Sequence, residues 1–131
     1  MRTRQIGVVT AQPWGFEVGV YDNMKNLEKD MTKLTGQKTK VNGACNGAYV
    51  WQDNPKTGET FFALYIAPHA DLGTVVHECQ HIMDAAHEEA GLPISYANTE
   101  LRAYQMGQLV REVAPLFGFS LDRQRSNING R

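Results

Sequence analysis

Two histidines four residues apart, with a glutamate between them, are the residues whose types and spacing point most directly to chemistry. The segment His77-Glu78-Cys79-Gln80-His81 matches the pattern H-E-x-x-H. On an α-helix, residues four apart are separated by about 40° around the axis and about 6 Å along it, so two imidazoles can point at one ion. Glu78 is turned about 100° from His77, off the ligand direction but near the water that a zinc ion activates. The pattern predicts one zinc ion (Zn2+) per chain, with Glu78 as general base.

The helix that carries this motif must turn its histidines away from the protein core. With His77 at zero, His81 lies near 40° and Asp84 near 340° around the axis. The apolar residues gather on the opposite side, between about 140° and 260°; they are Leu72, Val75, Val76, Cys79, Ile82, Met83, Ala86 and Ala90. We therefore expect this helix to pack on a sheet with one side and to face a cleft with the other. The alternative is a solvated helix face on which both histidines are ordinary surface residues.

A third metal ligand is needed, because a catalytic zinc ion takes three protein ligands and leaves one position open. His87 has the spacing of the third histidine in H-E-x-x-H-x-x-G-x-x-H, but Asp84 stands where that motif has glycine. The helix should therefore continue and turn His87 to about 280°, away from the metal, as a surface or supporting residue. We prefer Glu100, because the chain between His81 and Glu100 is long enough for a helix end, a turn and a return. The alternative for Glu100 is an acid favoured by the positive end of a helix.

The last helix presents a second set of candidates on one face. Glu100, Tyr104, Gly107 and Arg111 recur at helical spacing. Gly107 would permit a close approach to the motif helix. Tyr104 is then placed to donate a hydrogen bond to the oxyanion that forms during hydrolysis. A phenol packed between two helices is the alternative for Tyr104.

The two motifs together resemble a known family. The combination HECQHIMD followed by ELRAY is similar to the gluzincin group of zinc metallopeptidases, and in particular to small, poorly characterised metallopeptidases encoded by bacteria and their phages. The resemblance covers about residues 72 to 113, less than half of the chain. It implies a small zincin-like domain with His77, His81 and Glu100 as zinc ligands and Glu78 as the catalytic base.

The resemblance has further consequences for the surroundings of the site. It implies that the strand Thr60–Ile66 lies along the cleft and can pair with an extended peptide. Thermolysin-like members have an aspartate four residues after the ligand glutamate, where this chain has Tyr104. Asp84 could take over the task of holding a ligand histidine in place. The chain is much shorter than a large peptidase, so a deep specificity pocket is not expected.

Hydrophobic periodicity and turn residues predict the elements that position these groups. The order is β-β-α-β-β-α-α, an α+β domain with a mixed or antiparallel sheet of about four strands packed against helices. The expected elements are strands at Gln5–Thr10 and Phe16–Tyr21, a helix capped by Asp22 or Asn23 and ending at about Thr35, a loop at Lys38–Gly47, strands at Ala48–Gln52 and Thr60–Ile66, a helix from about Asp71 to Ala90, and a helix from about Asn98 to Pro115.

Length and composition indicate one packed domain. The chain has 131 residues, of which 42% are hydrophobic and 21% charged. We assign residues 1–121 to a single domain and residues 122–131 to a polar tail. No apolar run approaches the roughly 18 residues that span a bilayer, and the start does not read as a signal peptide. A cytoplasmic location is therefore expected, in the host cell if a phage encodes the chain, with no membrane partner. Cys45 and Cys79 are expected to be buried, reduced thiols.

The charge distribution favours cations over nucleic acid as partners. The net charge is −1, so no global field attracts nucleic acid. Between Thr57 and Glu100 there is no lysine or arginine, whereas there are seven acids. Such a stretch attracts a metal ion or a basic substrate, although a solvated acidic face is the alternative. The resemblance implies a peptide or protein substrate; a zinc-stabilised binding module without turnover is the competing hypothesis. The sequence does not indicate an oligomeric state.

Overall fold

The computed structural model describes residues 4–39, 41–44, 46–93 and 95–120. The predicted α+β class and element order are confirmed, with one short strand added in the segment expected to be a loop. The predicted polar tail at 122–131 lies outside the described residues. The elements are β1 (Gly7–Ala11), β2 (Phe16–Tyr21), α1 (Met24–Thr35), β3 (Asn42–Ala44), β4 (Gly47–Asp53), β5 (Thr60–Ile66), α2 (Leu72–Glu89) and α3 (Thr99–Val113), with short 3-10 helices at Tyr96–Asn98 and Ala114–Phe117.

The strands form one mixed sheet in the order β1-β2-β5-β4-β3, which is five strands rather than about four. β2 and β5 are parallel, and the other neighbouring pairs are antiparallel. β5 lies at the centre, paired with β2 on one side and with β4 on the other. The expectation that the strand Thr60–Ile66 accepts an extended peptide is therefore wrong, because neighbours occupy both of its edges.

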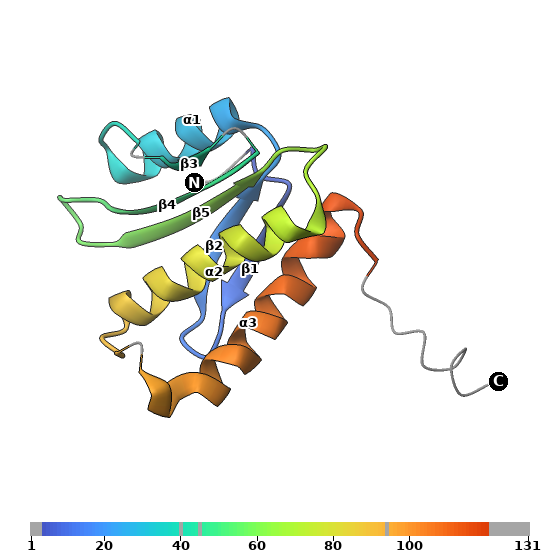
Figure 1. Cartoon of the computed structure of the whole chain (residues 1–131). Helices are drawn as coiled ribbons and strands as arrows, with labels where there is room; N and C mark the ends of the chain where they lie inside the picture. Colours follow the sequence, from blue (N-terminus) through green and yellow to red (C-terminus); the bar gives the residue numbers. More distant parts are fainter. Residues whose placement is uncertain (1–3, 40, 45, 94, 121–131) are drawn as a thin grey trace.

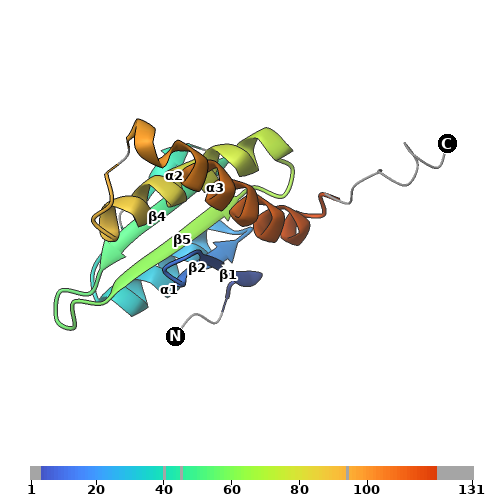
Figure 2. The same ribbon diagram turned by 90° about the horizontal axis from the view of Figure 1, so that it is seen from below.

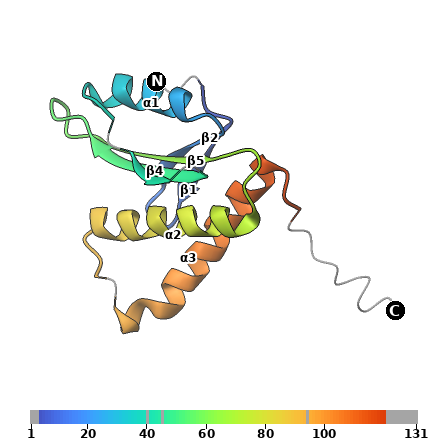
Figure 3. The ribbon, with the colours of Figure 1, turned by 45° about the horizontal axis from the view of Figure 1, so that its top comes forward.

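Helices cover both faces of the sheet. α1 lies on one face, and α2 and α3 lie on the other (Figures 1 and 3). α2 contacts β4 and β5, whereas α3 contacts β1 and lies beside α2 (Figure 2). Phe62, Leu64 and Ile66 of β5 join the core under α2 and α3, and Ala63 joins the core under α1. The apolar sequence of this strand thus reflects burial on both faces, as predicted.

The helices begin and end at the residues that the sequence predicts. The Asn23 side chain caps α1, and Gly36 ends it with a φ of 68°. The Asp71 carboxylate accepts a hydrogen bond of 2.9 Å from the backbone N–H of Thr74 at the start of α2. Gly91, with a φ of 74°, follows the end of α2. These caps fix the length of α2 and therefore the position of the H-E-x-x-H turn along the sheet.

Within the described part of the chain, no helix is both long enough and apolar enough to cross a bilayer.

Candidate metal centre

α2 brings the two motif histidines together. The Nε2 atoms of His77 and His81 are 3.2 Å apart, and the rings meet edge to face with centroids 4.8 Å apart. Zinc–nitrogen bonds are about 2.0–2.1 Å long, so two nitrogens at this separation can both reach one ion. The His77 side chain is 68% exposed, which leaves the pair accessible from solvent. The donor atoms and their spacing fit two ligands of a zinc ion.

Glu78 lies beside this pair but inside the protein. Its side chain is only 6% exposed, and its Oε2 lies 3.9 Å from Nε2 of His77. Within the described residues, its buried Oε1 has no hydrogen-bond partner. Burial raises the pKa of the Glu78 carboxyl, while His77 and His81 act in the opposite direction. A desolvated carboxyl next to two imidazoles is suited to accept and release a proton.

The buried carboxyl predicts that removing it changes stability in a pH-dependent way. Because folding raises its pKa, the ionised Glu78 opposes folding once the pH exceeds its unfolded value near 4.5. Metal-free Glu78→Gln should therefore unfold at a higher temperature than metal-free wild type at pH 7. The two should converge as the pH falls below about 4. Thermal unfolding across this range checks the expectation, and a wild type more stable than Glu78→Gln at pH 7 would contradict it.

Two residues of β4, which the motif does not include, form the wall behind these groups. A Cβ atom on Gly47 would lie 2.9 Å from Cγ and 3.0 Å from Oε2 of Glu78, so only glycine leaves room for the carboxyl there. Tyr49, on the same face of β4, stacks on His81 with ring centroids 4.6 Å apart and an interplanar angle of 14°. Sequence reasoning missed both residues; the alternation of side chains along β4 was the available signal.

Glu100 is not brought to the histidines. It is exposed, in the first turn of α3. In the parts of the chain that the structure describes, no three His, Cys, Asp or Glu side chains are grouped so that they could hold a metal ion. α3 contacts α2 through Arg102 and Gln105, and Glu100 is turned about 200° from Arg102. The expected return of Glu100 to the histidines is therefore not seen among the described residues.

The rest of the predicted face of α3 also points to solvent. Tyr104 is 73% exposed, so it is not packed between two helices. The nearest neighbour of a Cβ built on Gly107 is the Arg111 side chain, so this glycine does not serve a close approach to α2. The predicted contact face is wrong, because α3 crosses α2 with the face that carries Arg102, Gln105 and Leu109. Among the described residues no contact of Tyr104 with the H-E-x-x-H side chains is recorded, so its role as hydrogen-bond donor stays a prediction.

Asp84 joins the two helices. It accepts a hydrogen bond of 2.9 Å from the Gln80 side chain and one of 3.0 Å from the Arg102 guanidinium. The structure records no hydrogen bond from His77 or His81 to Asp84 among the described residues, so the expected support of a histidine is not seen. α2 continues unbroken through this position, as predicted.

His87 is a core residue rather than the surface or supporting histidine that we expected. It is fully buried, its Nε2 lies 2.8 Å from Oε1 of Gln105, and the ring meets Trp14 edge to face. The sequence pattern did not show that α3 and the β1–β2 turn would enclose it. Its contacts hold α3 on α2.

These positions predict effects of very different size on stability for two substitutions. His87→Ala should destabilise the protein by about 2–4 kcal/mol, because it leaves a cavity and removes the partner of the buried Gln105. Glu100→Ala should change stability by no more than about 0.5 kcal/mol, as for an ordinary surface residue. Neither should weaken zinc binding. Urea unfolding and competition with a chelator measure both effects. A large loss of zinc affinity in Glu100→Ala alone would restore Glu100 as a ligand.

Cys79 has no part in the centre. It is a free, buried cysteine, as predicted, and burial raises the pKa of its thiol to about 12. Since the thiolate is the form that binds metal, a thiol in this state is a core residue and not a ligand. Cys45 lies outside the described residues.

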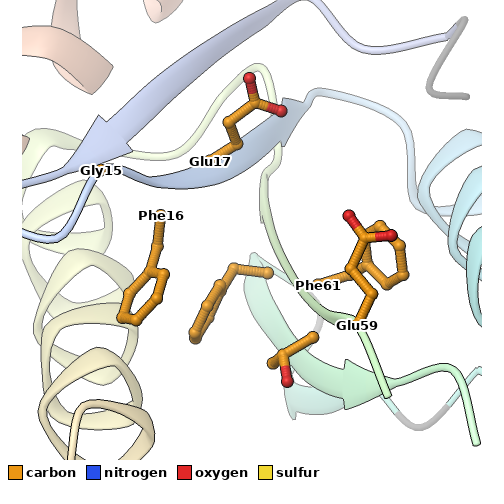
Figure 4. A pocket seen from close by; sticks show the side chains of 7 residues that line it. Gly15, Phe16, Glu17, Glu59 and Phe61 are labelled. Carbon is orange, nitrogen blue, oxygen red and sulfur yellow. The ribbon is translucent and has the colours of Figure 1, made fainter. Parts of the chain in front are cut away.

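Two of the hollows among the described residues lie away from the histidines. One, of about 350 Å³, lies where β2 and β5 begin and is lined by Phe16, Glu17, Glu59 and Phe61 among others (Figure 4). Another, of about 430 Å³, lies between the β4–β5 hairpin and the end of α2, and its walls include Glu89. Neither is lined by the H-E-x-x-H residues. Neither is therefore the cleft that the helix pattern predicts.

Comparison of the chain with protein-family models, curated proteins and solved structures gave no match. The resemblance to gluzincins thus rests on the residues of two motifs. The structure brings His77, Glu78 and His81 of the first motif together. It does not bring Glu100 of the second motif to them.

Proposed function

We propose that this protein is a zinc-dependent hydrolase of peptide bonds. The observation that carries the proposal is the pair of Nε2 atoms of His77 and His81, 3.2 Å apart, beside the buried carboxyl of Glu78. When bound, zinc supplies Lewis acidity, which makes water a nucleophile near neutral pH and polarises a carbonyl group. The motif resemblance to small bacterial and phage metallopeptidases supports the same reaction class.

In this proposal the side chains of α2 have two roles, metal binding and proton transfer. His77 and His81 hold the metal. Glu78 accepts the proton of the attacking water and delivers it to the departing amine. Its burial supports this role, because a desolvated carboxylate binds a proton more readily than one in water. The exposure of His77 leaves room for a polypeptide to approach the pair from solvent.

A second candidate is a zinc-stabilised binding module without turnover. Within the described residues no third ligand joins the two histidines; a catalytic zinc ion takes three protein ligands and a structural one four, so this observation weakens catalysis without itself completing a structural site. A metal held in this way could still stabilise a domain of this size. Glu78 distinguishes the two functions, because a structural site has no use for a buried carboxyl beside the metal.

The proposal is tested by measuring zinc and cleavage together. Elemental analysis of the purified chain should give one zinc per chain. Zinc-loaded protein, incubated with a mixture of unstructured proteins, should generate new termini detectable by mass spectrometry. A chelator should stop the cleavage and added zinc should restore it. Full zinc without cleavage would leave the binding module as the function, and absence of zinc binding would overturn both.

A further inference from the structure

His81 differs from His77 in being held by the sheet. His77 is largely exposed, and the ring contact recorded for it is with His81. His81 is half-buried and lies nearly parallel to the Tyr49 ring, with centroids 4.6 Å apart and 14° between the planes. Tyr49 of β4 therefore contacts His81 directly, and the recorded ring contact of His77 is with His81.

This stacking restricts rotation of the His81 ring, which sets the direction of its Nε2 lone pair. An imidazole attached to a helix can still rotate about its own χ2 bond, which is a soft torsion for histidine. Rotation changes the direction of the Nε2 lone pair. A ring lying flat against Tyr49 cannot rotate out of its plane without losing the stack, which is worth about as much as other aromatic pairs. The observed plane is the one that puts Nε2 of His81 within 3.2 Å of Nε2 of His77.

We propose that Tyr49 is a positioning residue of the metal centre, which fixes the plane of the His81 imidazole before metal arrives. The inference rests on the proposed function in one respect, that His77 and His81 bind the metal. It adds a residue of β4 to a centre for which the sequence predicts only residues of α2 and α3. The aromatic ring, and not the hydroxyl, is the part that acts.

The neighbouring Trp51 provides a matched control. It lies two residues further along the same face of β4 and also contacts α2, where its indole N–H donates a hydrogen bond of 2.9 Å to Glu89. It makes no recorded ring contact with either histidine among the described residues. Replacing Trp51 should therefore disturb the packing of α2 on β4 without releasing the His81 ring.

The test is a titration with Co²⁺, followed by its visible absorption, on folded variants checked by circular dichroism. Tyr49→Leu should bind Co²⁺ roughly tenfold more weakly than wild type, as expected when a group that orients a ligand is lost. Tyr49→Phe, which keeps the ring, should match wild type in affinity and spectrum. Trp51→Leu should also keep the wild-type affinity. Tyr49→Val serves as a second non-aromatic variant if Tyr49→Leu does not fold.

The outcomes separate this inference from the proposed function. Wild-type affinity in Tyr49→Leu or Tyr49→Val would overturn the positioning role and leave the metal centre intact. An equal loss in Trp51→Leu would also overturn it, because general packing would then explain the effect. If wild type binds neither Co²⁺ nor Zn²⁺, the metal centre itself fails. Absence of peptide cleavage alone would not affect the result, since the titration measures binding and not turnover.

Discussion

Replacing Glu78 by glutamine should abolish most peptide hydrolysis while zinc remains at one per chain. Glutamine keeps the shape of the buried side chain against Gly47 but cannot accept a proton. The loss should be at least the roughly 10²–10⁴-fold that removal of a general acid–base group causes. The zinc content should not change, because Glu78 lies 3.9 Å from Nε2 of His77 and is assigned no role as a ligand. The measurement is the rate at which new termini appear in a mixture of unstructured proteins.

Glu88→Gln is the matched control for this variant. Glu88 lies on the same side of α2 as His77 but is exposed, so the substitution removes the same charge without touching the buried carboxyl. It should cleave at the wild-type rate. If wild type cleaves nothing that Glu78→Gln spares, hydrolysis loses its support for the substrates sampled, and the zinc-stabilised binding module becomes the better hypothesis.

Removing both motif imidazoles should take the zinc content from one per chain to nearly none. In the double variant His77→Ala, His81→Ala both donor nitrogens of the pair are absent, and the described residues offer no group of three other ligands in their place. Elemental analysis after dialysis against buffer without metal gives the direct reading. The apo protein should keep its helical circular dichroism, because alanine favours a helix more than histidine does.

His69→Ala provides the comparison, since His69 is also an exposed histidine and lies outside the H-E-x-x-H turn. It should keep full zinc. Retention of zinc by the double variant would show that the metal binds elsewhere on the chain, and the proposed centre would then be wrong.

The parts of the structure that the sequence predicted well depend on short-range rules. Asn23 and Asp71 cap their helices through bonds to the backbone a few residues on, and Gly36 ends α1 because it adopts a positive φ. The shared direction of His77 and His81 follows from the helix, because residues four apart lie on one face. Val76 departs from the predicted apolar stripe of α2, because it lies at its margin and is 41% exposed.

The parts that could not be predicted depend on how elements cross. The sequence of α3 offers two faces, and Gly107 suggested the wrong one. The buried pairing of His87 with Gln105, together with the buried Leu109, selects the other face. That choice turns Glu100 away from the histidines. Periodicity within one helix does not contain this information, because it depends on which residues of a second helix lie opposite.

Local sequence patterns also did not predict the order of the strands in the sheet. The apolar sequence of β5 shows that both its faces are buried, but not which strands lie beside it. β3 is three residues long and contains glycine, so it gave no alternating signal. The contacts of Gly47 with Glu78 and of Tyr49 with His81 depend on the position of β4 beneath α2, which the sequence did not predict.

The parallel pairing of β2 with β5 has a consequence for the order in which the centre is assembled. These strands are separated in the chain by α1, β3 and β4, and such non-local pairings form late. His77 and His81 share a face as soon as one turn of helix forms, which takes about a microsecond. Glu78 is enclosed against Gly47, and His81 against Tyr49, only when β4 lies beneath α2. During folding the two histidines would thus share a helix face before the sheet holds their neighbours, so that an incompletely folded molecule would bind a metal less firmly and lack the enclosed base.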